Sequence, residues 1–302
     1  MFQMYTIFVI GSSNTDMVIQ SEHHPKPGET IMGSNFLSSP GGKGANQAIA
    51  ASRLGGNVIF LAKLGDDLFG QKAIQHFKNE GIHTQFVSIE PNKSSGVALI
   101  TVDSKGENTI VVAPGANQFL VKKDIDSLVN AFQRGDFALF QLEIPLQTVQ
   151  YGISLANSKG VKCVLNPAPA QKLSDELLKD LFAITPNETE AQILTGIEVT
   201  DIDSAEKAAR ILLDKGVQQV IITLGSQGAL YVSQNQMFHI KAPKVQAVDT
   251  TAAGDCFNGA LLVALSEGKD WKLALEFACK AATISVQKLG AQASLPNLND
   301  LL

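Results

Sequence analysis

Asp249-Thr250-Thr251-Ala252-Ala253-Gly254-Asp255 is the stretch on which the fold and the chemistry of this chain depend. It follows a segment of extended character, Val245 to Val248, and it precedes Phe257 and Leu261, which recur at helical spacing. The first amides of a helix have no intrahelical partner, and the small side chains here let an anion approach them. The stretch therefore predicts a phosphate site at a helix start, where Asp255 orients an attacking hydroxyl and accepts its proton.

A simpler interpretation of the same stretch is structural. Asp and Thr at a helix start are in most proteins only caps and first-turn charges. The stretch alone leaves both interpretations open, so the rest of the chain has to decide between them.

The composition describes a globular protein. Of the 302 residues, 45% are hydrophobic and 18% are charged, which allows a sizeable core in one large α/β domain or in two smaller ones. The net charge of -5 and the pI near 5.6 argue against broad nucleic-acid binding and against attraction to an anionic membrane. An anionic ligand would therefore have to be held by local donors.

Cysteine usage and the start of the chain indicate a cytoplasmic protein. Cys163, Cys256 and Cys279 are widely spaced and form no Cys-x-x-Cys pair, so neither a disulfide framework nor a zinc site is predicted. The apolar opening, Met1 to Ile10, is short and lacks a basic leader, so we interpret it as a buried strand and not as a signal peptide. No apolar run reaches transmembrane length.

A second glycine-rich motif, Pro40 to Gln47, opens another helix. It is not a Walker loop, because no Ser or Thr follows Lys43, and its glycine spacing also misses the dinucleotide fingerprint. It offers close backbone approach, one cation and one amide, which suit the hydroxyls of a small polar ligand. The alternative is a glycine-rich helix entry with an exposed Lys43.

The pattern of strands and helices predicts a large sheet with a small projecting one. Two strand pairs lack intervening helices, namely Asp16–Gln20 with Glu29–Leu37, and Val97–Val102 with Thr109–Ala113. From Phe137 onward strands and helices alternate regularly, which is typical of a largely parallel sheet.

Polar residues sit at the ends of several predicted strands, where ligands bind in sheets of this kind. They are Asn14, Asp16, Glu143, Asn166, Asn187, Glu190, Thr223, Gly225 and Gly228. Asn187 and Glu190 are three residues apart at a helix start, so they either hold a hydrated Mg²⁺ near phosphates or form a capping pair.

With both glycine-bearing motifs placed, the chain resembles the ribokinase-like carbohydrate kinases. The resemblance rests on Gly41–Asn46 and Asp249–Asp255 in combination, and shorter matches extend it over nearly the whole chain. The shorter matches are Asn14–Asp16, Asn166–Ala170, Thr185–Glu190 and Thr223–Gly228. The family implies an α/β fold of three αβα layers, with residues 1–302 forming one kinase domain. It also implies a β-sheet lid formed by about 14–40 and 93–115.

Site roles follow from the resemblance, position by position. The sugar would be held by Asn14, Asp16, Gly42, Lys43, Asn46, Glu143 and Asp255. Asp255 would be the catalytic base, and the amides of Ala253 and Gly254 would form the anion hole. The nucleotide site would comprise Asn187, Thr223, Leu224, Gly225, Ser226, Gln227, Gly228, Gly254 and Cys279. A monovalent cation would be held by Asp249, Thr251, Ser285, Lys288, Gly290 and Ser294, and Glu190 would lie near Mg²⁺.

Two departures from the family pattern involve cysteines. Cys279 stands where relatives often carry His or Asn beside the nucleotide base, and a thiol is only a weak donor. Cys256 stands where Thr is common, which is an exchange between small residues.

The resemblance implies phosphorylation of D-ribose at the 5-hydroxyl by ATP, with Mg²⁺ as cofactor, K⁺ as activator and a homodimer formed through the lid. The base, near a helix N-terminus, is expected to be weak. Within enzymes, the alternatives are sibling kinases acting on deoxyribose, fructose or a nucleoside. From another class, the chain could be a catalytically silent sugar-binding regulator. The missing fingerprint disfavours a dinucleotide-dependent oxidoreductase.

Overall fold

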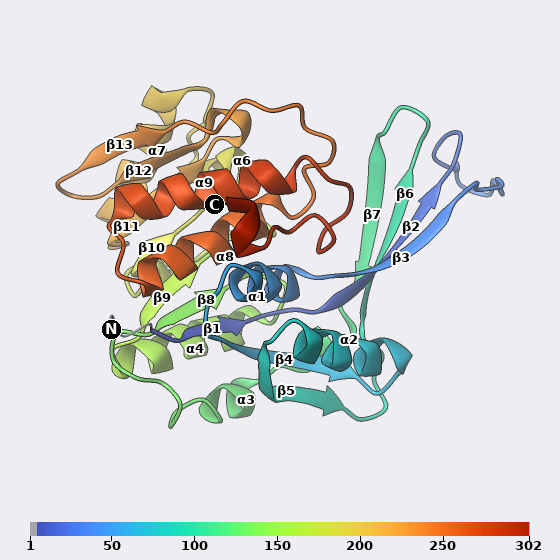
Figure 1. Ribbon diagram of the computed structural model, residues 1–302, viewed down its shortest axis with the longest axis horizontal. Helices are drawn as coiled ribbons and strands as arrows, with labels where there is room; N and C mark the ends of the chain where they lie inside the picture. Colours follow the sequence, from blue (N-terminus) through green and yellow to red (C-terminus); the bar gives the residue numbers. More distant parts are fainter. Residues whose placement is uncertain (1–4, 302) are drawn as a thin grey trace.

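A large, mostly parallel sheet forms the centre of the molecule (Figure 1). The computed structural model describes residues 5–301, so Met1–Met4 of the predicted opening strand lie outside the described residues. The strand order is β13-β12-β11-β10-β9-β8-β1-β4-β5, and the pairs β11–β12 and β12–β13 are antiparallel. The strands are β1 (Ile7–Ile10), β4 (Val58–Gly65), β5 (His83–Glu90), β8 (Phe137–Phe140), β9 (Lys162–Leu165), β10 (Ala183–Ile184), β11 (Gln219–Thr223), β12 (Ala229–Val232) and β13 (Met237–Ile240).

Helices cover both faces of this sheet. In β1 alternate side chains serve the two cores, since Ile7 and Val9 pack on one side and Phe8 and Ile10 on the other. This explains why the strand is apolar without interruption. One face carries α1 (Lys43–Arg53), α2 (Leu68–Asn79), α8 (Ala253–Ser266) and α9 (Trp271–Ser285). The other carries α3 (Lys122–Asp126), α4 (Leu146–Ser158), α5 (Asp175–Leu178), α6 (Glu188–Thr195) and α7 (Ile202–Asp214).

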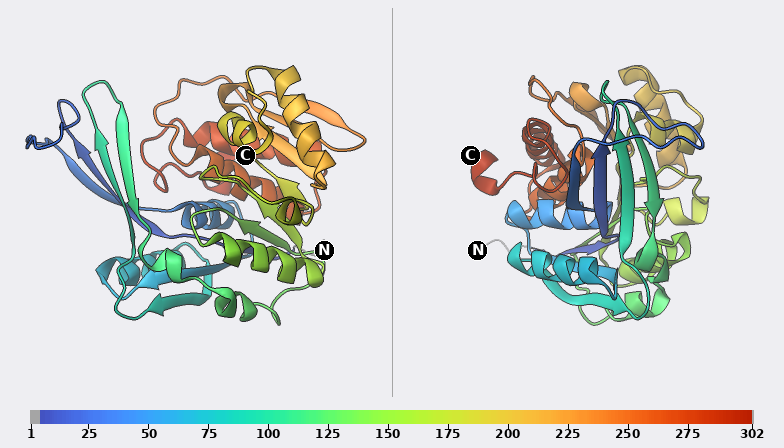
Figure 2. Two further views of the ribbon diagram at one scale, coloured as in Figure 1. Left: turned by 180° about the vertical axis from the view of Figure 1, so that it is seen from behind. Right: turned by 90° about the vertical axis from the view of Figure 1, so that its right-hand side faces the viewer.

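A second sheet projects from one end of the molecule (Figure 2). Its order is β3-β2-β6-β7, with β2 and β6 parallel and the other pairs antiparallel. The strands are β2 (Asn14–Gln20), β3 (Phe36–Gly41), β6 (Gly96–Val102) and β7 (Asn108–Ala113). The three layers and the small projecting sheet confirm the predicted fold class.

One predicted strand is wrong. Glu29–Leu37 was expected to be extended and paired, but β3 begins only at Phe36 and continues to Gly41. Residues before it lie in an exposed connection that contains Gly28 and Gly33. Pro40 obscured the true strand, yet β3 lies at the edge of its sheet, where a residue without an N–H is tolerated.

Other elements were missed or shorter than expected. The strands β5, β12 and β13 gave no clear pattern, and the helix expected from about Ser174 is a single turn, α5. Short 3₁₀ turns occur at η1 (Gly115–Phe119), η2 (Gly225–Gln227) and η3 (Leu298–Leu301). Among residues 5–301, no helix combines the length and the apolar character needed to cross a membrane.

Candidate active site

The start of α8 forms the centre of the site. Ala252 adopts a left-handed backbone conformation with φ of 60°, which turns the chain into the helix. Of the two amides predicted to form the anion hole, that of Ala253 already donates to Thr250 O at 3.2 Å. Within the described residues the structure shows no acceptor for the amides of Gly254 and Asp255. A Cβ added to Gly254 would meet nothing within 4 Å, so packing does not require glycine there. We call this N-terminal turn, Thr250–Asp255, the helix mouth.

Asp255 is buried at the helix mouth, with 5% of its surface exposed. Asn46 Nδ2 donates to its Oδ2 at 2.9 Å, and Gln47 Nε2 donates to its Oδ1 at 2.9 Å. Burial raises the pKa of Asp255, although Lys43 and the two amides act in the opposite direction. The expectation of a weak base is therefore wrong, because burial outweighs the groups that lower the pKa.

Lys43 is the cation of the site. It lines the same pocket as Asp255, and the charge of Asp255, ahead of that of Glu143, raises the pKa of Lys43. Glu143 is fixed through its Oε2, which accepts from Ser12 Oγ and from Lys43 N at 3.0 Å. The site therefore places one protonated amine among several carboxylates. Glu143 Oε1 makes neither the bond to Ser12 nor the bond to Lys43, so it can face a ligand.

Asp16 enters this charged cluster from β2. Its carboxylate lies so close to Gly41 of β3 that a Cβ there would come within 2.2 Å of Oδ2. Burial, followed by the charges of Glu143 and Asp255, raises the pKa of Asp16 to about 6. Glycine at position 41 thus makes room for the side chain of Asp16. Burial and the two neighbouring carboxylates disfavour the ionised form of this side chain.

Asn14 is oriented by a buried partner. Asn117 Nδ2 donates to Asn14 Oδ1 at 2.8 Å and to Ser13 O at 3.2 Å, while Asn117 Oδ1 accepts from Ser13 N at 2.9 Å. The Nδ2 of Asn14 is therefore available to donate to a ligand. Glycine at position 96 leaves the space for the contact between Asn117 and Asn14, because a Cβ there would come within 2.4 Å of Asn117 Nδ2.

A pocket joins the helix mouth to the ends of the parallel strands. Among the predicted site residues it is lined by Lys43, Asn187, Glu190, Thr223, Ala253, Gly254 and Asp255, and it also takes in Asn166, Ala168, Thr185, Thr250, Ala252 and Asn258. Asn187 and Glu190 form a capping box, in which Asn187 Oδ1 accepts from Glu190 N and Glu190 Oε2 accepts from Asn187 N. Glu190 Oε1 makes neither bond, so the pair can cap α6 and still face a ligand.

The predicted nucleotide segment follows β11. Leu224 and Gly228 are buried, whereas Gly225, Ser226 and Gln227 form the exposed turn η2. Gly228 has φ of 99°, and a Cβ there would come within 2.0 Å of Ile240 O, so this turn requires glycine.

Cys279 lies apart from these groups. It packs in the core on α9 with 4% of its surface exposed, and it does not line the pocket. Burial raises the pKa of its thiol to about 12. Its contact with a nucleotide base stays a prediction.

Three of the predicted cation ligands, Asp249, Thr251 and Gly290, lie together beside the helix mouth. Asp249 Oδ1 accepts from the backbone and hydroxyl of Thr251, and its Oδ2 accepts from Gly290 N at 2.8 Å. Burial acts to raise the pKa of Asp249, but these hydrogen bonds outweigh it and lower the pKa. Ser285 and Ser294 are buried, while Lys288 is exposed.

The donor set here suits a monovalent cation. Asp249 is the one carboxylate among the six predicted ligands, and both its oxygens already accept hydrogen bonds, so a cation there would rest mainly on backbone carbonyl oxygens. Rings of carbonyl oxygens are typical ligands of K⁺. The residues present therefore fit the ion that the resemblance implies.

Comparison with known proteins identifies the family. The model of the pfkB family of carbohydrate kinases matches residues 4–298. The chain belongs to this family. A ribokinase of Haemophilus influenzae is 47% identical over 98% of this chain and 97% of its own. A deoxyribokinase of Salmonella typhi is 40% identical over 97% and 96%, respectively. The structure of an Arabidopsis thaliana ribokinase complexed with ribose and ATP has a TM-score of 0.91 at 31% identity, covering 98% of this chain and 97% of its own.

This pfkB-family carbohydrate kinase is a phosphotransferase, and sequence analysis missed part of its site. Gln47 stands beside Asn46 on α1 but received no role, although both hold Asp255. A signal was present, because α1 is built mostly of small apolar residues and these two amides interrupt its buried stretch. Asn117 and Gln292 gave no such signal, since each lies in an irregular or short segment.

Proposed function

We propose that this kinase transfers the γ-phosphoryl group of ATP to the 5-hydroxyl of D-ribose, giving D-ribose 5-phosphate and ADP. The main support is one juxtaposition: the buried carboxylate of Asp255 and the amides of the helix mouth line one pocket. A base for the sugar hydroxyl and backbone amides that bind a phosphate thereby lie within reach of one sugar and one ATP molecule in the same pocket. The Arabidopsis ribokinase complexed with ribose and ATP shares the fold.

The chemistry needs little covalent help from the protein. The 5-oxygen forms a bond to the γ-phosphorus as the bond from that phosphorus to the bridging oxygen of ADP breaks, and the hydroxyl proton passes to Asp255. The transition state of such transfers is loose, so placement and charge stabilisation dominate. The raised pKa of Asp255 favours its holding the proton. The amides of Gly254 and Asp255 and the ammonium of Lys43 stabilise negative charge on the phosphoryl oxygens.

Sugar recognition would use the charged cluster beside the pocket. Asp16 can accept hydrogen bonds from two adjacent hydroxyls at once. Asn14 Nδ2 and Glu143 Oε1 are left free by their internal partners, so they supply a donor and an acceptor. Gly42 lets the backbone approach the ligand, and Asn46 carries an amide between the sugar and Asp255.

The nucleotide and ions would lie on the other side of the helix mouth. Thr223 to Gly228, with Asn187, would form the nucleotide site, and Cys279 would contact the nucleotide base only if the base reaches past the pocket toward α9. Mg²⁺ bound with ATP would neutralise phosphate charge, and Glu190 would hold its hydration water. K⁺ would occupy the loop of Asp249 and Gly290 and so stiffen the helix mouth.

The small sheet would serve as a lid. Closing residues 14–40 and 93–115 over the sugar would exclude water and limit hydrolysis of ATP. This sheet exposes large apolar side chains, among them Phe36 (63% exposed), Leu99 (55%) and Val111 (69%). Such a face is suited to pairing two subunits, so we propose a homodimer through the lid, in the cytoplasm.

The second candidate substrate is deoxyribose, because a deoxyribokinase is among the relatives at 40% identity. The paired acceptors of Asp16 favour ribose, since 2-deoxyribose lacks one of two adjacent hydroxyls. We expect kcat/KM for 2-deoxyribose to be at least about tenfold lower than for ribose.

A substrate panel with Mg-ATP tests this function. Ribose, 2-deoxyribose, fructose and a nucleoside are compared by ADP formation, once with potassium and once with sodium. Ribose should give the highest kcat/KM, and potassium should raise the rate. Absence of sugar-dependent ADP formation would support the regulator, and a preference for deoxyribose or fructose would support the sibling kinases.

A further inference from the structure

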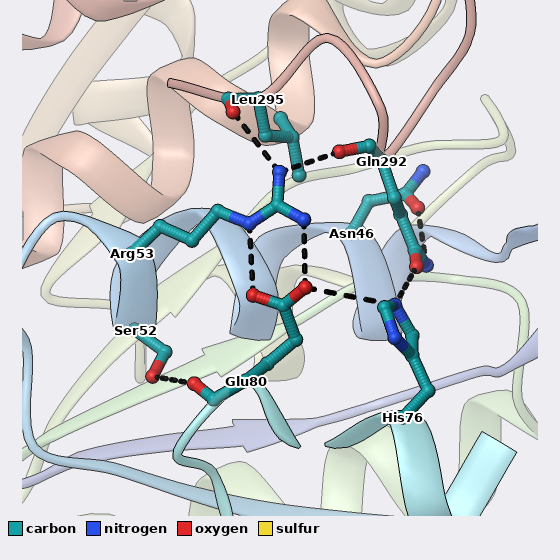
Figure 3. Close-up of polar contacts among 7 residues, drawn as sticks. All are labelled: Asn46, Ser52, Arg53, His76, Glu80, Gln292 and Leu295. Atoms are coloured by element: carbon teal, nitrogen blue, oxygen red, sulfur yellow. Dashed lines mark hydrogen bonds and ion pairs between the residues drawn. The ribbon is translucent and has the colours of Figure 1, made fainter. Parts of the chain in front are cut away.

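A chain of hydrogen bonds leads from the catalytic site to the outside of α2, and Figure 3 shows its outer part, from Asn46 through Gln292 to His76. Asn46 Nδ2 donates to Asp255 Oδ2 at 2.9 Å, and Asn46 Oδ1 accepts from Gln292 Nε2 at 3.0 Å. Gln292 Oε1 in turn lies 2.9 Å from His76 Nε2. The three outer residues come from α1, from the loop after α9 and from α2.

The direction of this chain is fixed by its inner end. An ionised carboxylate only accepts hydrogen bonds, so Asn46 must turn its NH₂ group toward Asp255. Asn46 Oδ1 then faces outward and needs a donor, which the NH₂ group of Gln292 supplies. Gln292 Oε1 therefore faces His76 and needs a proton on Nε2. Each member can satisfy its neighbour in one orientation only.

Gln292 itself is held rigidly. It is 3% exposed, and Arg53 Nη1 donates to its backbone oxygen at 2.7 Å and to Leu295 O at 3.0 Å. Arg53 is anchored in turn by Glu80, through Nε to Oε2 at 2.8 Å and Nη2 to Oε1 at 2.7 Å. Figure 3 shows this guanidinium between the carboxylate and the loop. The backbone that carries the Gln292 side chain is therefore anchored independently of Asn46.

We propose that Gln292, with His76 behind it, is a positioning residue that locks the amide of Asn46 and thereby the carboxylate of Asp255. The inference rests on the proposed function, in which Asp255 is the base. Without the donor on Gln292, Asn46 can rotate and turn its oxygen toward the carboxylate. Asp255 would then keep the bond from Gln47 alone of its two amide donors, and it would sample orientations that do not face the sugar hydroxyl.

The test replaces the amide of Gln292 by a side chain of similar shape that lacks the amide donor and acceptor. We expect Gln292→Met to lower kcat by about tenfold, since it leaves a buried polar group unsatisfied beside the base, while KM for ATP stays within about twofold. The control is Gln75→Met on α2, because Gln75 is exposed and donates to Asn79 on the same helix. This control should keep the kinetics of the parent protein.

His76 gives a second, independent variant pair. His76→Phe removes the donor to Gln292, and His76→Gln restores one, so the former should lower kcat about threefold and the latter should keep it. Because both residues act through one chain, the double variant Gln292→Met/His76→Phe should be no slower than Gln292→Met. If Gln292→Met does not fold, the His76 pair decides the question.

Three results would overturn the proposal: an unchanged kcat in Gln292→Met, equal kcat in the two His76 variants, or losses that multiply in the double variant. Two parallel assays separate this outcome from failure of the proposed function. Slow Asp255→Asn with unaffected Gln292→Met refutes only the positioning role, and active Asp255→Asn refutes the assignment of Asp255 as the base. Failure of the proposed function shows instead as absence of ribose-dependent ADP formation by the parent protein.

Discussion

Asp255→Asn is expected to lower kcat by roughly 10² to 10⁴ while sugar binding largely survives. The variant keeps the shape of the side chain, so the pocket at the helix mouth should persist. It removes a carboxylate that is buried, has a raised pKa and lines the pocket from α8. The loss in kcat should be limited to the contribution of the base, because the amides of the helix mouth and Lys43 still stabilise the phosphoryl oxygens.

Two controls accompany the measurement of this variant. Thermal unfolding should show that the protein is folded, and ribose binding measured by calorimetry should remain within about tenfold of the parent. The Asn side chain faces Asn46 and Gln47, which both donate to the native carboxylate, so a modest loss of stability is expected. Unchanged turnover in Asp255→Asn would refute the assignment of the base.

Asp16→Asn is expected to have opposite effects on binding and on stability. The amide keeps one acceptor but cannot accept from two adjacent hydroxyls as a carboxylate does, so KM for the sugar should rise about 10²-fold. Burial and the charges of Glu143 and Asp255 raise the pKa of Asp16 to about 6 in the folded protein. Removing that charge should therefore stabilise the protein at neutral pH.

The sign of the stability effect follows from proton binding. The folded state, with the higher pKa, binds more protons than the unfolded chain between the ordinary pKa of 3.8 and the raised pKa of about 6. The free energy of unfolding therefore falls as pH rises through this window, and the penalty is complete above it. After discounting for partial exposure, the gain in Asp16→Asn should be about 1–2 kcal/mol at about pH 7.5 and absent at about pH 3.5.

The same pKa predicts a pH dependence of sugar binding. A protonated Asp16 loses part of its acceptor capacity, so the dissociation constant for ribose should rise as pH falls below about 6. Calorimetry from about pH 5 to about pH 8 on the parent and on Asp16→Asn measures both effects. A flat profile in the parent, or an unchanged KM for the sugar in the variant, would contradict the role of Asp16.

The local parts of the site could be predicted from sequence because each is encoded by neighbouring residues. The helix mouth was recognised from small residues followed by an apolar helix, and the structure places α8 at Ala253 as expected. The rhythm after Phe137 likewise follows from short-range patterns, since each βα unit buries its own apolar face. The function could be predicted only from the combination of Gly41–Asn46 and Asp249–Asp255, because neither motif alone would have been sufficient.

The contacts between distant segments could not be predicted. Asn46 and Asp255 are 209 residues apart. The sequence pattern does not indicate that α1 and α8 meet through the amides of Asn46 and Gln47 and the carboxylate of Asp255. The raised pKa of Asp255 was missed for the same reason, since burial is a property of the assembled layers. The strand β3 was misplaced because Pro and Gly suggest a turn, whereas its position at a sheet edge depends on partners elsewhere.

The central claim is that a sugar hydroxyl and the terminal phosphorus of ATP meet at the helix mouth. A crystal structure of the protein with ribose, Mg²⁺ and a non-hydrolysable ATP analogue tests it most directly. The account predicts the 5-hydroxyl within hydrogen-bond distance of an Asp255 oxygen, and the γ-phosphate on the amides of Gly254 and Asp255. A γ-phosphate bound elsewhere, or an Asp255 that contacts no substrate atom, would contradict it.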